Sequence, residues 1–202
     1  MRSAHIVAAC LVASLGGGCV PMPRSQYVPV AASGDVVYAE CVLNSHIPVG
    51  VRVPIGRAFA VLKLGEHEGR TYVELRLEVP PGTTLSLDGD LVEVETTGEP
   101  VRSQVRFPSI SLVDTPILNS HSMVGAVRDQ QLSVGSRMVG GEVAAGSVRS
   151  HRHFWLAAYI EVAGTQELKV TLPPVVEDGA AVHRLQVAFR AKTVVPVAVI
   201  NC

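Results

Sequence analysis

Residues 71–79, TYVELRLEV, decide the fold, because apolar and charged residues alternate along them one by one. The apolar set is Val73, Leu75, Leu77 and Val79, and the charged set between them is Glu74, Arg76 and Glu78. Successive side chains of a β-strand point to opposite faces of a sheet. The stretch therefore predicts a strand with one apolar face, which lies in a core, and one charged face.

The same alternation recurs on both sides of this stretch. The further runs lie at residues 84–87, 91–95, 101–107, 168–172 and 185–190, and glycines and prolines separate them. Asp88-Gly89-Asp90 between the first two runs is a strong hairpin signal, and glycines that flank residues 66–68 predict a second hairpin tip. Such runs are typical of an antiparallel sandwich or barrel. We expect an all-β fold, an antiparallel β-sandwich, with an immunoglobulin-like arrangement as its most specific form.

One run departs from the alternation. Residues 154–160, FWLAAYI, are apolar on both faces. A central strand that is covered on both sides has this pattern. Trp155 and Tyr159 also allow a second interpretation, a surface for a partner protein, because Trp and Tyr are favoured at interfaces.

Length and composition narrow the class of protein. The chain has 202 residues, of which 48% are hydrophobic and 17% charged, and its formal net charge is −1. A disordered chain would be richer in charge and poorer in apolar residues, and nucleic-acid-binding proteins are usually basic. We therefore expect one folded domain that does not bind nucleic acid.

The first residues predict export. Arg2 precedes an apolar stretch at residues 6–15, and three glycines and Cys19 follow. A short cationic start, an apolar segment of about ten residues and small residues at its end are typical of a signal peptide. The apolar segment is too short to span a bilayer, which takes about 20 residues. We assign residues 1–18 to the signal peptide.

The sequence Leu15-Gly16-Gly17-Gly18-Cys19 resembles the cleavage box of bacterial lipoproteins, with Gly16 at the place where that box has leucine. The resemblance implies cleavage before Cys19 and lipid on this cysteine, and Val20 after it implies sorting to the outer membrane, facing the periplasm. Several acyl chains hold a protein on a membrane almost irreversibly, because each buried methylene contributes about 0.8 kcal/mol. Ordinary cleavage is the alternative, and it would give a soluble periplasmic or secreted protein.

Residues 19–35 predict an anchored tether. They begin with Cys19, contain three prolines and end in small and polar residues. At about 3.1 Å per residue, such a segment reaches about 50 Å from the membrane. A single β-sandwich domain is then expected at residues 36–202.

Cys41 and Cys202 are the two cysteines that remain if Cys10 is removed with the signal and Cys19 carries lipid. An exported chain meets an oxidising compartment, in which such thiols pair. Their disulfide would close a loop of about 160 residues and contribute up to about 5 kcal/mol in the chain-entropy model. Two free thiols are the alternative.

His151 and His153 are the strongest candidates for chemistry. Residues two apart on a strand point to the same side, so both could bind one metal ion. A zinc site needs three or four ligands, and His121, Glu142 or His183 would have to supply the others. Nothing in the sequence indicates that these residues lie near His151 and His153. Motifs for a nucleophilic serine, a zinc helix or a phosphate loop are also absent. We predict no metal, no cofactor and no catalytic residues.

Together these features favour a non-catalytic binding or assembly module of the cell envelope, held on the membrane through Cys19. Its partner is expected to be another envelope protein, and its oligomeric state stays open. A periplasmic hydrolase with a metal site near His151 and His153 is the first alternative. A small-ligand carrier with a pocket between the sheets is the second.

Overall fold

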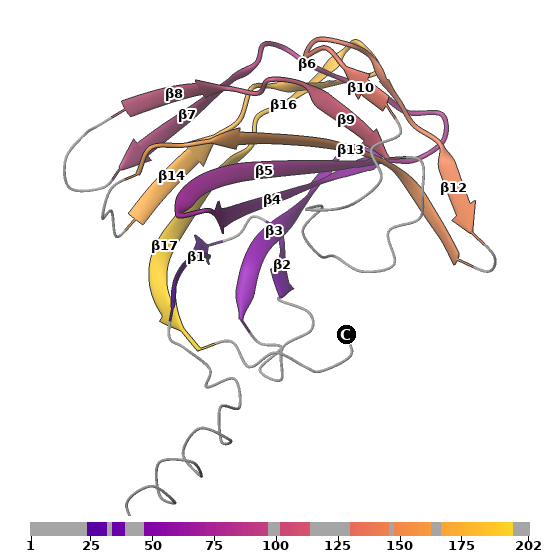
Figure 1. The fold of residues 1–202 in the computed structure, drawn as a ribbon. Helices are drawn as coiled ribbons and strands as arrows, with labels where there is room; N and C mark the ends of the chain where they lie inside the picture. Colours follow the sequence, from indigo (N-terminus) through magenta and orange to yellow (C-terminus); the bar gives the residue numbers. More distant parts are fainter. Residues whose placement is uncertain are drawn as a thin grey trace, which may run out of the picture.

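The computed structural model describes residues 24–31, 34–38, 47–96, 102–113, 130–145, 148–162 and 167–195. These residues form seventeen β-strands and no helix, and every strand pair is antiparallel. The expected all-β sandwich is therefore confirmed (Figure 1). Cys19, Cys41, Cys202 and His121 lie outside the described residues. No helix in the described part could cross a membrane.

The largest sheet contains eight strands. Its order is β10 (Gln130–Leu132), β9 (Ile110–Val113), β13 (Val148–Tyr159), β5 (Arg70–Val79), β4 (Ala58–His67), β3 (Pro48–Ile55) and β2 (Asp35–Tyr38), and β12 (Glu142–Ala145) pairs with β13. Strands β2 to β5 follow one another as a meander. The β4–β5 turn has positive φ at its two central residues, 52° at Glu68 and 73° at Gly69, as tight hairpin turns require. The predicted hairpin tip is thus confirmed.

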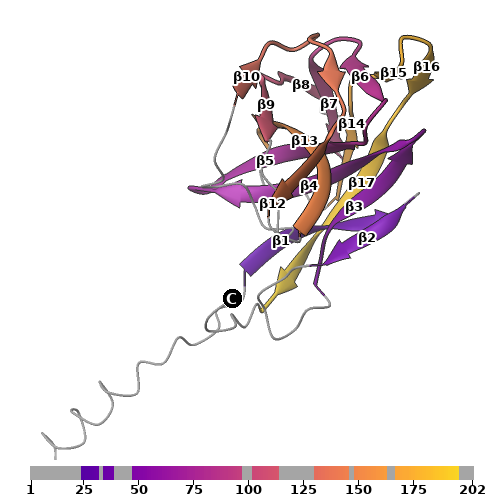
Figure 2. The same cartoon turned by 90° about the vertical axis from the view of Figure 1, so that its right-hand side faces the viewer.

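Two smaller sheets complete the fold. The second sheet has the order β1 (Arg24–Ala31), β17 (Gln186–Val194), β14 (Glu167–Thr171), β7 (Leu91–Thr96) and β8 (Arg102–Arg106). The third has the order β11 (Met138–Val139), β6 (Thr84–Leu87), β15 (Val175–Glu177) and β16 (Ala181–His183). Figures 1 and 2 place the third sheet at one end of the molecule and strands β1 and β2 toward the other. The strand number and order differ from the seven- or nine-stranded immunoglobulin arrangement.

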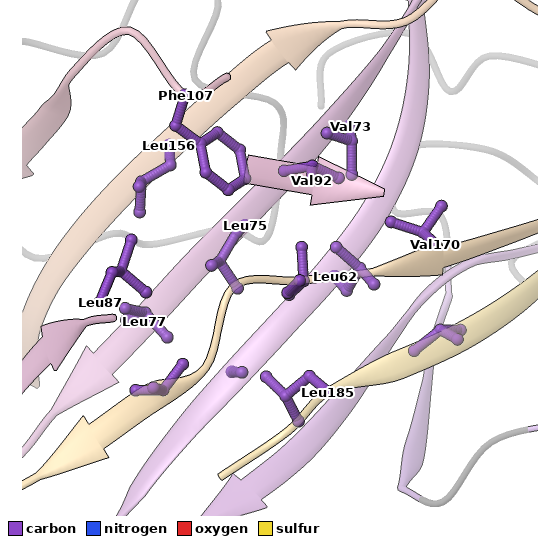
Figure 3. Close-up of a cluster of buried hydrophobic side chains, with 14 of the residues drawn as sticks. Leu62, Val73, Leu75, Leu77, Leu87, Val92, Phe107, Leu156, Val170 and Leu185 are labelled. Carbon is purple, nitrogen blue, oxygen red and sulfur yellow. The ribbon is translucent and has the colours of Figure 1, made fainter. Parts of the chain in front are cut away.

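The core lies between the inner faces of the large and second sheets. All four apolar positions of residues 71–79 are fully buried in it, as the alternation predicted. Figure 3 shows Leu62, Leu75 and Leu156 of the large sheet in one cluster with Val92 and Val170 of the second sheet. Burial of such a side chain stabilises the fold by about 1.5–3 kcal/mol, so this cluster fixes how the two sheets face each other.

The expected hairpin across Asp88-Gly89-Asp90 is wrong. Strands β6 and β7 on its two sides belong to different sheets. The Asp88 N–H donates to the carbonyl of Pro174 at 2.8 Å, and the Asp90 carbonyl accepts from the Phe107 N–H at 3.0 Å. The backbone groups around the turn are thus paired with other segments, and the turn carries the chain from the third sheet to the second.

The predicted tether at residues 19–35 is too long. Residues 24–31 form β1, which pairs with β17 from Arg24↔Val194 onward. Tyr27 packs against the core, and Pro29 is tolerated because β1 is an edge strand with a register shift just after this proline. The prolines of this segment favour a tether over a strand in the sequence. The folded domain therefore includes Arg24, and its expected boundary at residue 36 is corrected.

Candidate functional site

The outer face of the large sheet, opposite the core, carries the most unusual set of side chains. The register across β5 and β13 sets Trp155 against Arg76, His153 against Glu78, Ala157 against Glu74 and Tyr159 against Tyr72. Strand β4 adds Phe59 beside Glu78 and Lys63 beside Glu74. Alternation alone places all of these side chains on one face. The face thus joins charged, imidazole and aromatic groups in adjacent rows.

Two arginines hold Glu78 at the centre of this face. Arg52 donates to Glu78 Oε2 from Nη2 at 2.9 Å and from Nε at 3.2 Å, and Arg76 Nη2 donates to Oε1 at 3.0 Å. Burial alone would raise the pKa of Glu78, but the Arg52 hydrogen bond and the charges of Arg76 and Arg52 outweigh it and lower that pKa. The Arg52 guanidinium also lies 3.3 Å from the ring centroid of Phe59. We call Arg52, Arg76 and Glu78 the charged row.

Two buried groups beside the charged row titrate abnormally. Burial raises the pKa of Glu74 from 4.5 to about 7, although Lys63 and Arg76 oppose the shift. Burial, and then the charge of Arg76, lowers the pKa of His153 from 6.5 to about 4. His153 Nδ1 is buried and has no hydrogen-bond partner among the residues that the structure describes. At neutral pH the imidazole is therefore uncharged, and the Glu74 carboxyl group keeps its proton to a much higher pH than an exposed glutamate does.

The end of this face at the β4–β5 hairpin is aromatic and exposed. Tyr159 is 43% exposed. Its ring meets Tyr72 edge to face with centroids 6.2 Å apart, and the Arg70 guanidinium lies 4.1 Å from the Tyr159 centroid. Tyr72 itself lies over Gly65, where a Cβ atom would come within 2.4 Å of its ring. We call Arg70, Tyr72 and Tyr159 the aromatic cluster.

The two residues of the predicted partner surface differ in exposure. Trp155 is 6% exposed and packs against Val113, whereas Tyr159 is open to solvent. Around Phe154 and Leu156, β13 is buried on both faces, as expected of a central strand. The partner surface stays a prediction, and Tyr159 is the member that a partner could reach.

The histidine pair lies on one side of β13, as its spacing indicates, but its surroundings differ from those of a metal site. His151 is exposed and His153 buried. Glu142 lies opposite His151 in the β12–β13 register, and its carboxylate accepts from Arg149 Nη1 at 2.5 Å. His183 belongs to the third sheet, 3.4 Å from Glu177. No cluster of three metal-ligating side chains occurs among the described residues.

The charged row and Glu74 are not recognisable as site residues from the sequence. Their alternation with leucine and valine is typical of a solvated strand face, yet Glu74 and Arg76 are buried. One signal was available, because residues 154–160 are apolar on both faces and a neighbour of such a strand is covered too. That signal does not identify the neighbouring strand, which is set by the β5–β13 pairing.

Comparison of the chain with known protein families, curated proteins and solved structures finds no match. The geometry of the outer face is therefore the main guide to function.

Proposed function

We propose that this protein is an exported, lipid-anchored binding or assembly module of the cell envelope, without catalytic activity. Cys19 carries the lipid, the outer membrane holds the anchored chain, and the domain faces the periplasm. The anchor is supported by the signal-like first residues and by the resemblance of residues 15–19 to a lipoprotein cleavage box. The binding role is supported by the aromatic cluster on the outer face of the large sheet.

The single observation that carries the binding role is the preorganised exposure of Tyr159. Its ring is held from two sides by Arg70 and Tyr72, and Tyr72 is held in turn by its fit over Gly65. A rigid ring loses little conformational freedom on binding. Tyrosine and arginine are also the residues that most often dominate binding energy at interfaces. The cluster therefore suits an envelope protein that buries Tyr159.

A crosslinking purification from the membrane fraction tests the binding role. Tyr159→Ala in the full chain should reduce recovery of a specific partner by at least about tenfold, the loss typical of an interface hot spot. Tyr38→Ala is the matched control, because Tyr38 is 48% exposed and lies on β2, at the edge of the same sheet. Equal recovery with both variants, or equal loss, would contradict a partner site at Tyr159.

The intact mass of the mature chain tests the anchor. A triacylated chain that begins at Cys19 is expected in the membrane fraction, and Cys19→Ala should move the protein to the soluble periplasmic fraction. A mature chain without lipid would refute the anchor and favour the soluble alternative.

A further inference from the structure

The first strand of the domain begins close to the proposed lipid site. Four residues, 20–23, separate Cys19 from Arg24, the first residue of β1. A fully extended chain advances at most about 3.6 Å per residue, so the two Cα atoms lie within about 18 Å of each other. A domain of this size has a radius of gyration of about 16 Å and a diameter of about 40 Å. The link is therefore shorter than half of the diameter of the domain.

The register of β1 shows which part of the domain this short link holds. Arg24 pairs with Val194 and Gln26 pairs with Lys192, so the start of β1 lies beside the end of β17. Both views place this end of the molecule away from β16 and the third sheet (Figures 1 and 2). Lys192 and Val195 are exposed there. The apolar stem and cationic head of Lys192 and the apolar side chain of Val195 suit the boundary between lipid headgroups and acyl chains.

We propose that the end of the sandwich formed by the start of β1 and the end of β17 rests on the lipid headgroups of the membrane that holds Cys19. The third sheet then points away from this membrane. This inference rests on the proposed lipid anchor, and it goes further because it fixes the orientation of the domain. A tether that reached 50 Å would have left the domain free to rotate.

Photo-crosslinking to lipid tests the orientation in the full, lipidated chain. A photoreactive amino acid replaces Val195, which is 43% exposed at the proposed contact, or Val182, which is 56% exposed on β16 at the other end. We expect lipid adducts from the Val195 position to exceed those from the Val182 position by about tenfold, since a short link raises the local concentration of lipid at one end only. Similar yields from both positions, or protein adducts alone at Val195, would overturn the orientation.

A spacer variant separates the effect of the link from that of the anchor. Twenty Gly and Ser residues inserted after Met22 lengthen the link from four residues to about 24, which lowers the effective concentration at the membrane by about tenfold. The lipid adducts at Val195 should fall accordingly, while the mass still shows the acyl chains. A lipidated protein without preferential crosslinking at Val195 refutes this inference alone. A protein without lipid refutes the proposed anchor and the inference together.

Discussion

At the scale of single residues, Glu74 and His153 are two buried titratable groups whose pKa values move in opposite directions. The carboxyl group of Glu74 keeps its proton up to about pH 7, and the imidazole of His153 loses its proton at about pH 4. Both shifts arise mainly from burial, because a charged group is poorly solvated inside a protein. The outer face therefore holds both groups in their uncharged forms over the intervening pH range.

These shifts predict how stability depends on pH. The pKa of Glu74 is higher in the folded than in the unfolded state. The contribution of Glu74 to the free energy of unfolding is therefore lost as pH rises from 4.5 to about 7. The pKa of His153 is lower in the folded state, so the contribution of His153 to the free energy of unfolding is lost as pH falls from 6.5 to about 4. Between these limits the two effects nearly cancel. Glu74→Gln should remove the first effect, so that stability rises by about 2 kcal/mol from pH 4.5 to 6.5.

Urea unfolding at several pH values, followed by Trp155 fluorescence, measures this slope. Glu66→Gln is the control, because Glu66 is exposed at the hairpin tip and should leave the slope unchanged. A Glu74→Gln variant with the same pH dependence as the parent would show that Glu74 does not titrate in this way.

Gly65 and Tyr72 form a second residue-scale pair. Gly65→Ala places a Cβ atom 2.4 Å from the Tyr72 ring, so the ring must move, at a cost of about 2 kcal/mol in unfolding free energy. In a Tyr72→Ala background the same change should cost almost nothing, because the colliding ring is gone. A double-mutant cycle measures the coupling, and additive costs would mean that the ring does not depend on Gly65.

At the scale of elements, the β15–β16 hairpin holds the turn between β3 and β4 of the large sheet through side-chain hydrogen bonds. We call this contact the clasp. Glu177 Oε1 accepts from the backbone N–H of Arg57 at 2.9 Å, and Arg57 Nη2 donates to Asp178 Oδ2 at 2.6 Å. Gly56 approaches Glu177 so closely that a Cβ atom would lie 1.7 Å from Oε2. The contact joins the large sheet to the third sheet, whose own strands are short.

The clasp predicts unequal costs for two glycine substitutions. Gly56 and Gly179 both have positive φ, 55° and 76°, but Gly179 has open space around it. Gly179→Ala should therefore cost only the conformational strain, about 1 kcal/mol. Gly56→Ala should cost at least about 2 kcal/mol more, since it also displaces the buried carboxylate of Glu177. Equal urea midpoints for the two variants would contradict the clasp.

Strand alternation predicts elements better than it predicts their pairing. The run at 71–79 is a strand with a buried apolar face, and residues 154–160 lie mostly in a central strand. Yet β6 and β7, joined by Asp88-Gly89-Asp90, pair with different sheets. A turn signal states that the chain reverses, whereas the partner of each strand depends on which distant strand offers matching backbone groups and apolar surface.

At the scale of the whole molecule, the predicted Cys41–Cys202 disulfide would close a loop of about 160 residues. Reduction should then lower the free energy of unfolding by up to about 5 kcal/mol, and the mature chain should gain the mass of about two hydrogens. Cys41→Ser should reproduce the effect of reductant on the urea midpoint. An oxidised chain whose mass and midpoint do not respond to reductant would contain two free thiols.

The site was less predictable than the fold. The sequence predicts Trp155 and Tyr159 together as a partner surface, because both lie in an apolar run, and only the structure shows that Tyr159 is exposed and Trp155 buried. The sequence does not predict the charged row, because Arg52 and Glu78 meet only through the pairing of β3, β4 and β5. Likewise, the sequence does not show that the Tyr72 ring packs over Gly65, since this contact depends on the pairing of β4 with β5.

The sequence by itself determined the all-β class, the apolar strand faces and the β4–β5 hairpin tip, because side-chain alternation and turn chemistry act over neighbouring residues. Only the tertiary structure decided that residues 24–31 close the second sheet as β1 and that the Asp88–Asp90 turn joins two sheets. It also decided that the charged face of β5 is buried. These features depend on contacts between strands far apart in the chain, where backbone pairing and burial outweigh local preference.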